Sequence, residues 1–515
     1  MHRALRFVEL LVVFRMLSTS RAAIVFGLVG ITLALVLVVL RLDNAVSFTE
    51  PLQLDTSGAE WESLYAVWRI VNGEALYTDR REIPFNAVVY NWLFYNSFAA
   101  FTGIGLKLTG LSDMWLPTVA RMFSLLGAAA GTAIAYLSFR RAFDAPQANA
   151  TAVRVVIGCF ALYLFFGPLM GWWVFTVRSD LWAMVLEITG ITIFMRYYRG
   201  NWVVAVLALA LFAYLAWSFK QVNVFAAGAG GLFLLLRGDW RSIFLLSAAF
   251  VALVGATLLI GGGDYVENIL FSITAQFTWT TYFRNLTNFL VKSGPTLFPL
   301  AVLAAVALTD RAFRRRVWES DWSVLALCGV AVTGPIISLA SSKYGASEVY
   351  YLTLSYFLVL AGLSCASDLI TVRGAAPNLL NAALSLGWLS FIAAIMLVLV
   401  GKQGTIDLRP HHELMMAMKR CVDPLPRPVF ISHGRIALPW MAPGQSPNFV
   451  TSFSYDKERK AGVPFEAGGI AGLITSGYFK SLALYGTKRP QSFDGVPLDD
   501  FKYLGGCEKL QLFVR

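Results

Sequence analysis

The chain has 515 residues, of which 57% are hydrophobic and 14% charged, and its formal net charge is +11. Because soluble domains devote about a quarter of their residues to charged side chains, this composition excludes a cytosolic enzyme, a disordered scaffold and a disulfide-stapled mini-domain. Repeated apolar runs of about 20 residues fit the hydrocarbon core of a bilayer and favour helices over a β-barrel. We therefore predict an all-α polytopic membrane protein.

The hydropathy pattern predicts about eleven transmembrane helices. The first apolar run follows four arginines and is too long for the core of a cleavable signal peptide, so we expect a retained span. The predicted spans cover residues 22–42, 117–139, 153–172, 181–197, 202–219, 222–236, 242–261, 295–309, 322–341, 349–367 and 379–401.

Alternation of these spans places most arginine-rich connections on the side of the amino terminus. These connections contain Arg140, Arg141, Arg196, Arg199, Arg237, Arg241, Arg311, Arg314, Arg315, Arg316 and Arg373. By the positive-inside rule that side is the cytoplasm. The other side is then the outer, periplasmic face of a bacterial-type inner membrane, and the basic excess marks topology and not a nucleic-acid partner.

Two segments of different character are expected on the outer face. Residues 43–116 form a long outer loop, in which we expect residues 90–108 to lie as an amphipathic helix in the interface and not to span the membrane. Residues 402–515 are rich in proline and turn residues, which predicts a small soluble domain of α/β or α+β content. The membrane domain therefore comprises residues 1–401.

The cysteines agree with this division. Cys159, Cys328 and Cys365 lie inside predicted spans, where a reduced cysteine acts as a small hydrophobic residue. Cys421 and Cys507 are the only cysteines of the tail. In an oxidising compartment we expect them to form a disulfide, the alternative being two free thiols.

Motifs of soluble enzymes are missing from the sequence. It contains no GxxxxGK[ST], HExxH or paired CxxC motif, and its four histidines lie at the amino end and in the tail, which excludes a histidine-built metal centre in the membrane region.

The most informative segment lies in the outer loop, at residues 55–95. Residues 60–71 have helical spacing, and Gly73 is well placed to end that helix. Glu60 points with the apolar stripe of this helix, whereas Glu62 points with the polar one. A carboxylate directed toward the membrane costs free energy unless it has a partner or a task.

Four short motifs in order resemble the GT-C superfamily of membrane glycosyltransferases, in particular the group of protein O-mannosyltransferases and lipid A aminoarabinose transferases. The motifs are WESLYA (61–66), VRSDLWAM (177–184), FKQ (219–221) and SKYGASEVYYL (342–352). In that group an Asp-Glu pair leads the first motif. Here Glu62 matches the Glu while Trp61 replaces the Asp, with Glu60 and Asp55 nearby.

The resemblance implies transfer of a sugar from a polyprenyl-phosphate donor to a lipid, glycan or protein acceptor. Negative charge on the leaving phosphate needs cations, and the acceptor hydroxyl needs a carboxylate base. It implies Glu60, Glu62 or Asp55 as the base, and Arg178, Lys220 and Lys343 as the phosphate clamp. The supporting residues from the same motifs are Asp180, Gln221, Glu348 and Tyr350.

Simpler roles and other functions stay open at this point. The alternative role of Arg178 and Asp180 is a local ion pair at a helix end, and that of Lys220 and Lys343 is to act as interface anchors. The alternative functions are a lipid-linked saccharide flippase and a glycan polymerase or ligase. Glu187, an acidic residue inside a predicted span, is the best pointer to transport. No cofactor is indicated with certainty, but carboxylates alone can hold Mg²⁺ or Mn²⁺.

Overall fold

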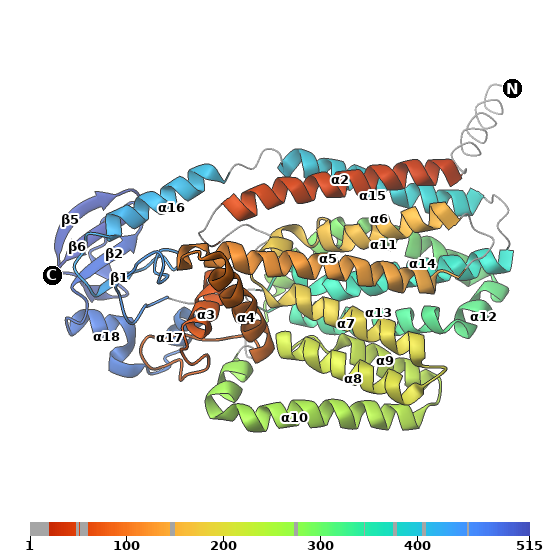
Figure 1. The fold of residues 1–515 in the computed structure, drawn as a ribbon, viewed down its shortest axis with the longest axis horizontal. Coiled ribbons are helices and arrows are strands. Elements are labelled where there is room, and N and C mark those ends of the chain that lie inside the picture. Colours follow the sequence, from red (N-terminus) through yellow and green to blue (C-terminus); the bar gives the residue numbers. More distant parts are fainter. Residues whose placement is uncertain are drawn as a thin grey trace.

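The computed structural model describes residues 20–47, 51, 60–144, 150–271, 277–343, 346–373, 379–403, 408–450 and 453–515. Asp55, one of the three candidate bases, lies outside these ranges. Figure 1 shows a long bundle of helices with a small domain at one end.

A helix occupies each of the eleven predicted spans. These helices are α2 (Ser20–Ser47), α5 (Leu116–Ala142), α6 (Ala150–Phe166), α7 (Ser179–Tyr197), α8 (Trp202–Phe219), α9 (Phe225–Leu236), α10 (Trp240–Phe271), α11 (Trp279–Thr309), α13 (Asp321–Ala340), α14 (Leu352–Arg373) and α15 (Leu379–Gln403). Among the described residues, seven helices are long and apolar enough to cross a membrane. The chain is a multi-pass membrane protein, although the number of eleven spans is not confirmed.

Two helices extend beyond the apolar runs that predicted them. Helix α11 begins at Trp279, well before the predicted start at residue 295. Helix α10 continues to Phe271 through a kink at Gly262, where φ is 75°. Hydropathy detects only the apolar part of such helices and does not extend to their polar ends.

The packing of the bundle separates an interior from a lipid-facing surface. The span around α14 is 89% buried, whereas that of α10 is only 6% buried. Large apolar side chains such as Phe244, Leu259 and Ile260 are exposed on α10, as expected for a helix whose outer face contacts lipid.

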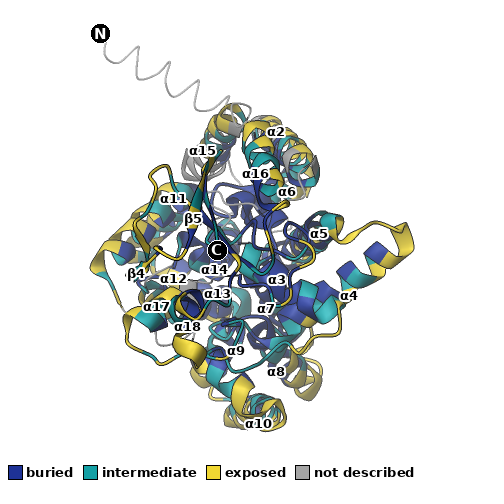
Figure 2. Cartoon of the chain, turned by 90° about the vertical axis from the view of Figure 1, so that its left-hand side faces the viewer, coloured by how far each residue is buried: buried dark blue, intermediate teal, exposed yellow. Residues whose placement is uncertain are grey.

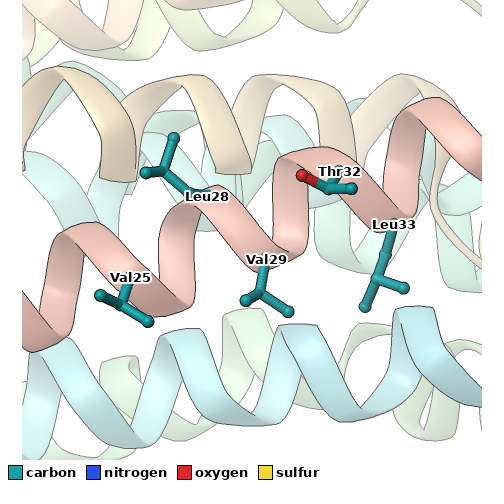
Figure 3. Close-up of a pocket in the computed structure, with 5 residues that line it drawn as sticks. All are labelled: Val25, Leu28, Val29, Thr32 and Leu33. Atoms are coloured by element: carbon teal, nitrogen blue, oxygen red, sulfur yellow. The ribbon is translucent and has the colours of Figure 1, made fainter.

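An apolar groove of about 340 Å³ follows α2, between α6 and α15 (Figure 3). It is lined by Val25, Leu28, Val29, Thr32 and Leu33. Because none of these side chains is titratable, the groove offers no catalytic group.

The two ends of the bundle differ in character. One end, here called the basic end, carries the helix α12 (Arg311–Glu319) with its four arginines. The opposite end, here called the site end, carries α3 (Trp61–Val71), α4 (Trp92–Thr109) and the carboxyl-terminal domain (Figure 1). Three short 3-10 helices belong to the bundle, η1 (Asp113–Trp115), η2 (Gly171–Phe175) and η3 (Glu348–Tyr351).

Helix α4 does not run with the bundle. In the end-on view of Figure 2 it lies crosswise to the bundle helices, and it packs against α3, α5 and α8. Its buried face includes Phe94, Tyr95 and Phe98, whereas Ile104 and Leu108 are exposed. This arrangement agrees with the predicted interfacial helix.

The carboxyl-terminal domain is built around a four-stranded sheet of order β1-β2-β6-β5. Strand β1 pairs with β2 in parallel, and the other pairs are antiparallel. Its elements are α16 (Arg409–Val422), β1 (Val429–Ile431), α17 (Phe453–Lys460), η4 (Glu466–Gly468), α18 (Gly469–Thr475), β2 (Ser481–Tyr485), β3 (Ser492–Phe493), β4 (Val496–Pro497), β5 (Lys502–Cys507) and β6 (Leu510–Val514). Cys421 and Cys507 form a disulfide that ties α16 to β5.

The carboxyl-terminal domain docks on the long loop between α2 and α5. Arg80 of that loop pairs with Glu458 of α17 at 2.8 Å. The Glu466 carboxylate accepts a hydrogen bond of 2.8 Å from the backbone N–H of Ile83. The loop is thereby held between the domain and the bundle.

Candidate active site

Three connections at the site end bring the predicted phosphate-binding residues together. Arg178 precedes α7, Lys220 ends α8, and Tyr350 belongs to η3 just before α14. Helix α7 packs against both α8 and α14. Residues far apart in the sequence therefore meet because these helices begin or end at the same level of the bundle.

Arg178 lies between two aromatic rings. Its guanidinium carbon is 5.2 Å from the ring centre of Tyr90 and 4.9 Å from that of Trp173, and Nη2 donates a hydrogen bond to the Tyr90 hydroxyl. Coulombic interactions join Arg178 to Asp180 and Glu62. The rings hold the guanidinium plane in place.

Tyr90 faces the same group of charges. It interacts electrostatically with Arg178, Asp180 and Lys220, and burial raises its pKa. The hydroxyl therefore keeps its proton at neutral pH and can donate a hydrogen bond to an anion.

Lys220 and Asp180 form a buried ion pair. The Lys220 ammonium contacts Asp180 Oδ1 and lies 3.8 Å from the ring centre of Tyr350. The second oxygen, Asp180 Oδ2, is buried and accepts no hydrogen bond from any described residue. A buried carboxylate oxygen without a donor costs free energy, so this atom is suited to receive a hydrogen bond from a bound molecule or from water.

A small cavity of about 10 Å³ opens beside this ion pair. That volume is roughly the space for one water molecule. Its lining combines the three connections: Asp180, Lys220, Val222, Asn223, Phe225, Val349, Tyr350, Leu352 and Thr353.

Lys343 lies near this group, in the connection between α13 and η3. It forms an isolated antiparallel bridge with Phe277. Burial, together with the charges of Lys457 and Lys220, lowers its pKa. Lys343, Lys220 and Lys457 therefore add positive charge to one region, and Lys457 comes from the carboxyl-terminal domain.

The remaining supporting residues have other partners. Gln221 donates a hydrogen bond of 2.8 Å to the Val89 carbonyl, which fixes the outer loop next to Tyr90. Glu348 pairs with Lys292 of α11. Glu348 thus anchors η3 to α11, and Lys220 takes Asp180 as its ion-pair partner.

The two described candidate bases are in different environments. Glu60 is fully buried, and its carboxylate binds Arg121 Nη2 at 2.7 Å and the backbone N–H of Val177 at 3.0 Å. Glu62 is half-buried in the first turn of α3 and interacts electrostatically with Arg178 and Tyr95. Only Glu62 combines partial exposure with proximity to the clamp.

Four residues of this region escaped the sequence analysis: Tyr90, Trp173, Arg121 and Lys292. Arg121 could have been found from the sequence, because an arginine inside the predicted span 117–139 needs an acidic partner. Lys292 lies just before a predicted span and was hidden by the late start assigned to α11. Among the described residues, no group of three or more His, Cys, Asp or Glu side chains is arranged to hold a metal ion.

Comparison with solved structures shows the fold. ArnT from Cupriavidus metallidurans bound to undecaprenyl phosphate aligns with a TM-score of 0.57 at 12% identity, over 94% of this chain and 97% of that chain. The apo form of the same protein gives a TM-score of 0.54 at 13% identity with the same coverage.

An archaeal protein gives a second alignment. The oligosaccharyltransferase AglB from Archaeoglobus fulgidus, in complex with an inhibitory peptide and a dolichol-phosphate, aligns with a TM-score of 0.52 at 13% identity, over 89% of this chain and 69% of that chain. No family model matches the sequence, and no curated protein matches it. ArnT and AglB are both GT-C proteins, and this chain shares their fold, as expected from the resemblance to that superfamily.

Proposed function

We propose that the protein is a membrane glycosyltransferase that moves a sugar from a polyprenyl-phosphate donor to a lipid, glycan or protein acceptor. The observation that carries the proposal is the meeting of Arg178, Lys220, Asp180 and Tyr350 at the site end, within electrostatic range of Glu62. The fold adds support, since ArnT is solved with undecaprenyl phosphate and AglB with dolichol-phosphate.

The proposed chemistry assigns a task to each charge. Arg178 offers paired N–H donors to the donor phosphate, and Lys220 and Lys343 add point charges. As the bond from sugar to phosphate breaks, these cations stabilise the negative charge that develops on the leaving phosphate. Glu62 accepts the proton of the acceptor hydroxyl. Direct displacement inverts the anomeric carbon.

Glu62 is a better candidate for the base than Glu60. Both oxygens of Glu60 are bound inside the protein by Arg121 and Val177, so an acceptor has no route to them without breaking a buried ion pair. Asp55 lies outside the described residues and stays an expectation from the sequence.

The flippase alternative has less support. The candidate site lies where helices begin and end at one level of the bundle, whereas a transport site is expected near the middle of the membrane. Glu187, the main pointer to transport, is occupied by hydrogen bonds within the bundle. A glycan polymerase or ligase would use the same arrangement with a larger donor.

We place the site on the outer face of a bacterial-type inner membrane, with the amino terminus in the cytoplasm. The arginines of the basic end are then cytoplasmic, in agreement with the positive-inside rule. Reporter fusions after Arg141 and at Arg515 test this orientation. A cytoplasmic carboxyl-terminal domain would overturn it.

The decisive experiment uses purified protein and a labelled polyprenyl-phosphate sugar. Free polyprenyl phosphate should appear only when acceptor is present, and Glu62→Gln should abolish its release. Movement of intact donor across a vesicle membrane without its cleavage would instead support a flippase. A parallel assay with a chelator, followed by Mg²⁺ or Mn²⁺, tests whether a divalent metal assists the reaction.

A further inference from the structure

Glu187 lies in the interior of the bundle, beneath the candidate site. It follows Asp180 by seven residues on α7, which is about two helical turns and places both side chains on one face. Its side chain is buried. A carboxylate in such a place is costly unless donors surround it.

Four hydrogen bonds satisfy this carboxylate. Oε1 accepts from the backbone N–H groups of Phe225 at 2.7 Å and Ala226 at 3.3 Å. Oε2 accepts from the Thr353 hydroxyl at 2.8 Å and the Asn223 amide at 3.3 Å. Glu187 therefore caps α9, whose first N–H groups have no acceptor within their own helix.

Each partner of Glu187 is close in the chain to a residue of the site. Asn223 closes a turn on Lys220, with its backbone N–H 2.9 Å from the Lys220 carbonyl. Thr353 is one helical turn after Tyr350. Asn223 and Thr353 also line the small cavity beside the ion pair of Lys220 with Asp180.

One carboxylate thus joins the three connections that carry the site. It is part of α7, it bonds the start of α9 and hence the turn after Lys220, and it bonds the first turn of α14 after Tyr350. A displacement of any of these elements would move Lys220 or Tyr350 relative to Asp180.

We propose that Glu187 is a positioning residue, which fixes Lys220 and Tyr350 against Asp180 so that the site is formed before a lipid phosphate arrives. This inference rests on the proposed function, because it assumes that the Lys220 region binds the phosphate of a polyprenyl lipid. Glu187 acts through Lys220 and Tyr350 and does not itself contact the phosphate.

Two substitutions separate positioning from a role of the charge. Glu187→Gln keeps the length of the side chain and one carbonyl oxygen for the N–H groups of α9. The new amide can donate to the Thr353 hydroxyl, and to Asn223 once that side chain turns its oxygen toward it. Glu187→Ala removes all four bonds. If Glu187 positions the site, the Gln variant should resemble the wild type and the Ala variant should not.

The control is another buried carboxylate, far from the site. Asp368 of α14 lies at the basic end, where it accepts a 2.6 Å hydrogen bond from Ser323 and pairs with Arg316 at 3.3 Å. Asp368→Ala also removes a buried carboxylate from the bundle. It should lower the unfolding temperature without changing the affinity for a phosphate lipid.

The experiment measures binding of undecaprenyl phosphate to the full chain in lipid nanodiscs, together with thermal unfolding. We expect Glu187→Ala to weaken binding about tenfold and Glu187→Gln to stay within about twofold of the wild type. Thr353→Val, which keeps the side-chain shape, should weaken binding about threefold and provides the test if Glu187→Ala does not fold.

The outcomes are distinct. If the wild type does not bind undecaprenyl phosphate, the proposed function is wrong, whatever the variants do. If the wild type binds and a folded Glu187→Ala variant or Thr353→Val variant binds equally well, the positioning role is wrong. Equal loss in Glu187→Gln and Glu187→Ala would show that the negative charge itself is required, which also contradicts positioning.

Discussion

Glu60 and Arg121 form an ion pair in which both side chains are fully buried, with Arg121 Nη2 2.7 Å from Glu60 Oε2. Arg121 also donates to the Ala45 carbonyl at 3.0 Å, and Glu60 accepts from the Val177 N–H. The start of α3 is thereby joined to α2, to α5 and to the residue that precedes Arg178. This pair sets the position of Glu62 relative to the clamp.

Glu60→Ala should destabilise the protein, because it leaves the Arg121 charge buried without its carboxylate. Removal of one partner of a buried pair typically costs about 3–5 kcal/mol. Thermal unfolding in detergent measures the loss. The double variant Glu60→Ala, Arg121→Met should recover part of it, since no charge is then left uncompensated.

A conservative variant, Glu60→Gln, distinguishes the two described candidate bases. If Glu60→Gln unfolds at the wild-type temperature yet has no turnover, Glu60 takes part in the chemistry and the assignment to Glu62 is wrong.

Glu62→Gln should fold normally and lose turnover. The substitution keeps size and removes the basic oxygen, and loss of a general base typically costs about 10²–10⁴-fold in rate. The KM for the donor should change little, since the clamp is intact. Glu74→Gln is the matched control, because Glu74 lies in the same loop, is exposed and pairs with Arg69, which is not part of the clamp. A Glu62→Gln variant with full activity would eliminate Glu62 as the base.

The bundle was largely predictable from sequence, because a run of apolar residues long enough to cross lipid has few alternatives to a helix. The ends of α10 and α11 were not, since their polar turns carry no hydropathy signal. Arg178 and Lys220 were predictable as charges at helix ends. The aromatic neighbours of Arg178, Tyr90 and Trp173, were not, because tyrosine and tryptophan are common at every membrane interface.

The buried partner of Glu60 escaped the sequence for a similar reason. The direction of Glu60 along the apolar stripe was read correctly, but the partner lies 61 positions later in the sequence, on α5. A periodic pattern shows which way a side chain points and not what it meets. For Glu187 the same limit applies, since its bonds to Phe225 and Thr353 come from two other helices.

Arg178→Lys should impair donor binding even though the charge is kept. A lysine lacks the planar fork that binds a phosphate through paired donors, and it loses the guanidinium contact with the rings of Tyr90 and Trp173. We expect the KM for the donor to rise about tenfold or more. Arg199→Lys, at an exposed arginine that pairs with Asp321 at the basic end, should leave kinetics unchanged. Equal kinetics of the Arg178→Lys variant and the wild type would remove Arg178 from the clamp.

Cys507→Ser should destabilise the carboxyl-terminal domain. The disulfide to Cys421 closes a loop with a sequence separation of 86 residues, and loss of a native disulfide typically costs about 2–5 kcal/mol. A lower unfolding temperature of the variant, equal to that of the reduced wild type, is the expected result. Cys159→Ser, inside the bundle, provides the comparison for loss of a thiol that forms no disulfide. An unchanged unfolding temperature in reducing buffer would show that the disulfide is dispensable.

Lys343 should give the reaction an alkaline limit below the range of an ordinary lysine. Burial lowers its pKa, and the neighbouring charges of Lys457 and Lys220 lower it further. Only the protonated amine attracts a phosphate, so donor affinity is complete below the pKa of Lys343 and falls as the pH rises through it.

The measurement is kcat/KM for the donor between about pH 7 and pH 10.5, where an unperturbed lysine would still be charged over most of the range. Lys343→Arg should move the alkaline fall of kcat/KM to higher pH, because arginine keeps its charge throughout. Lys343→Met should remove this fall and give a lower kcat/KM over the whole range. If kcat/KM falls at the same pH in both variants as in the wild type, the titration belongs to another group and Lys343 does not bind the phosphate.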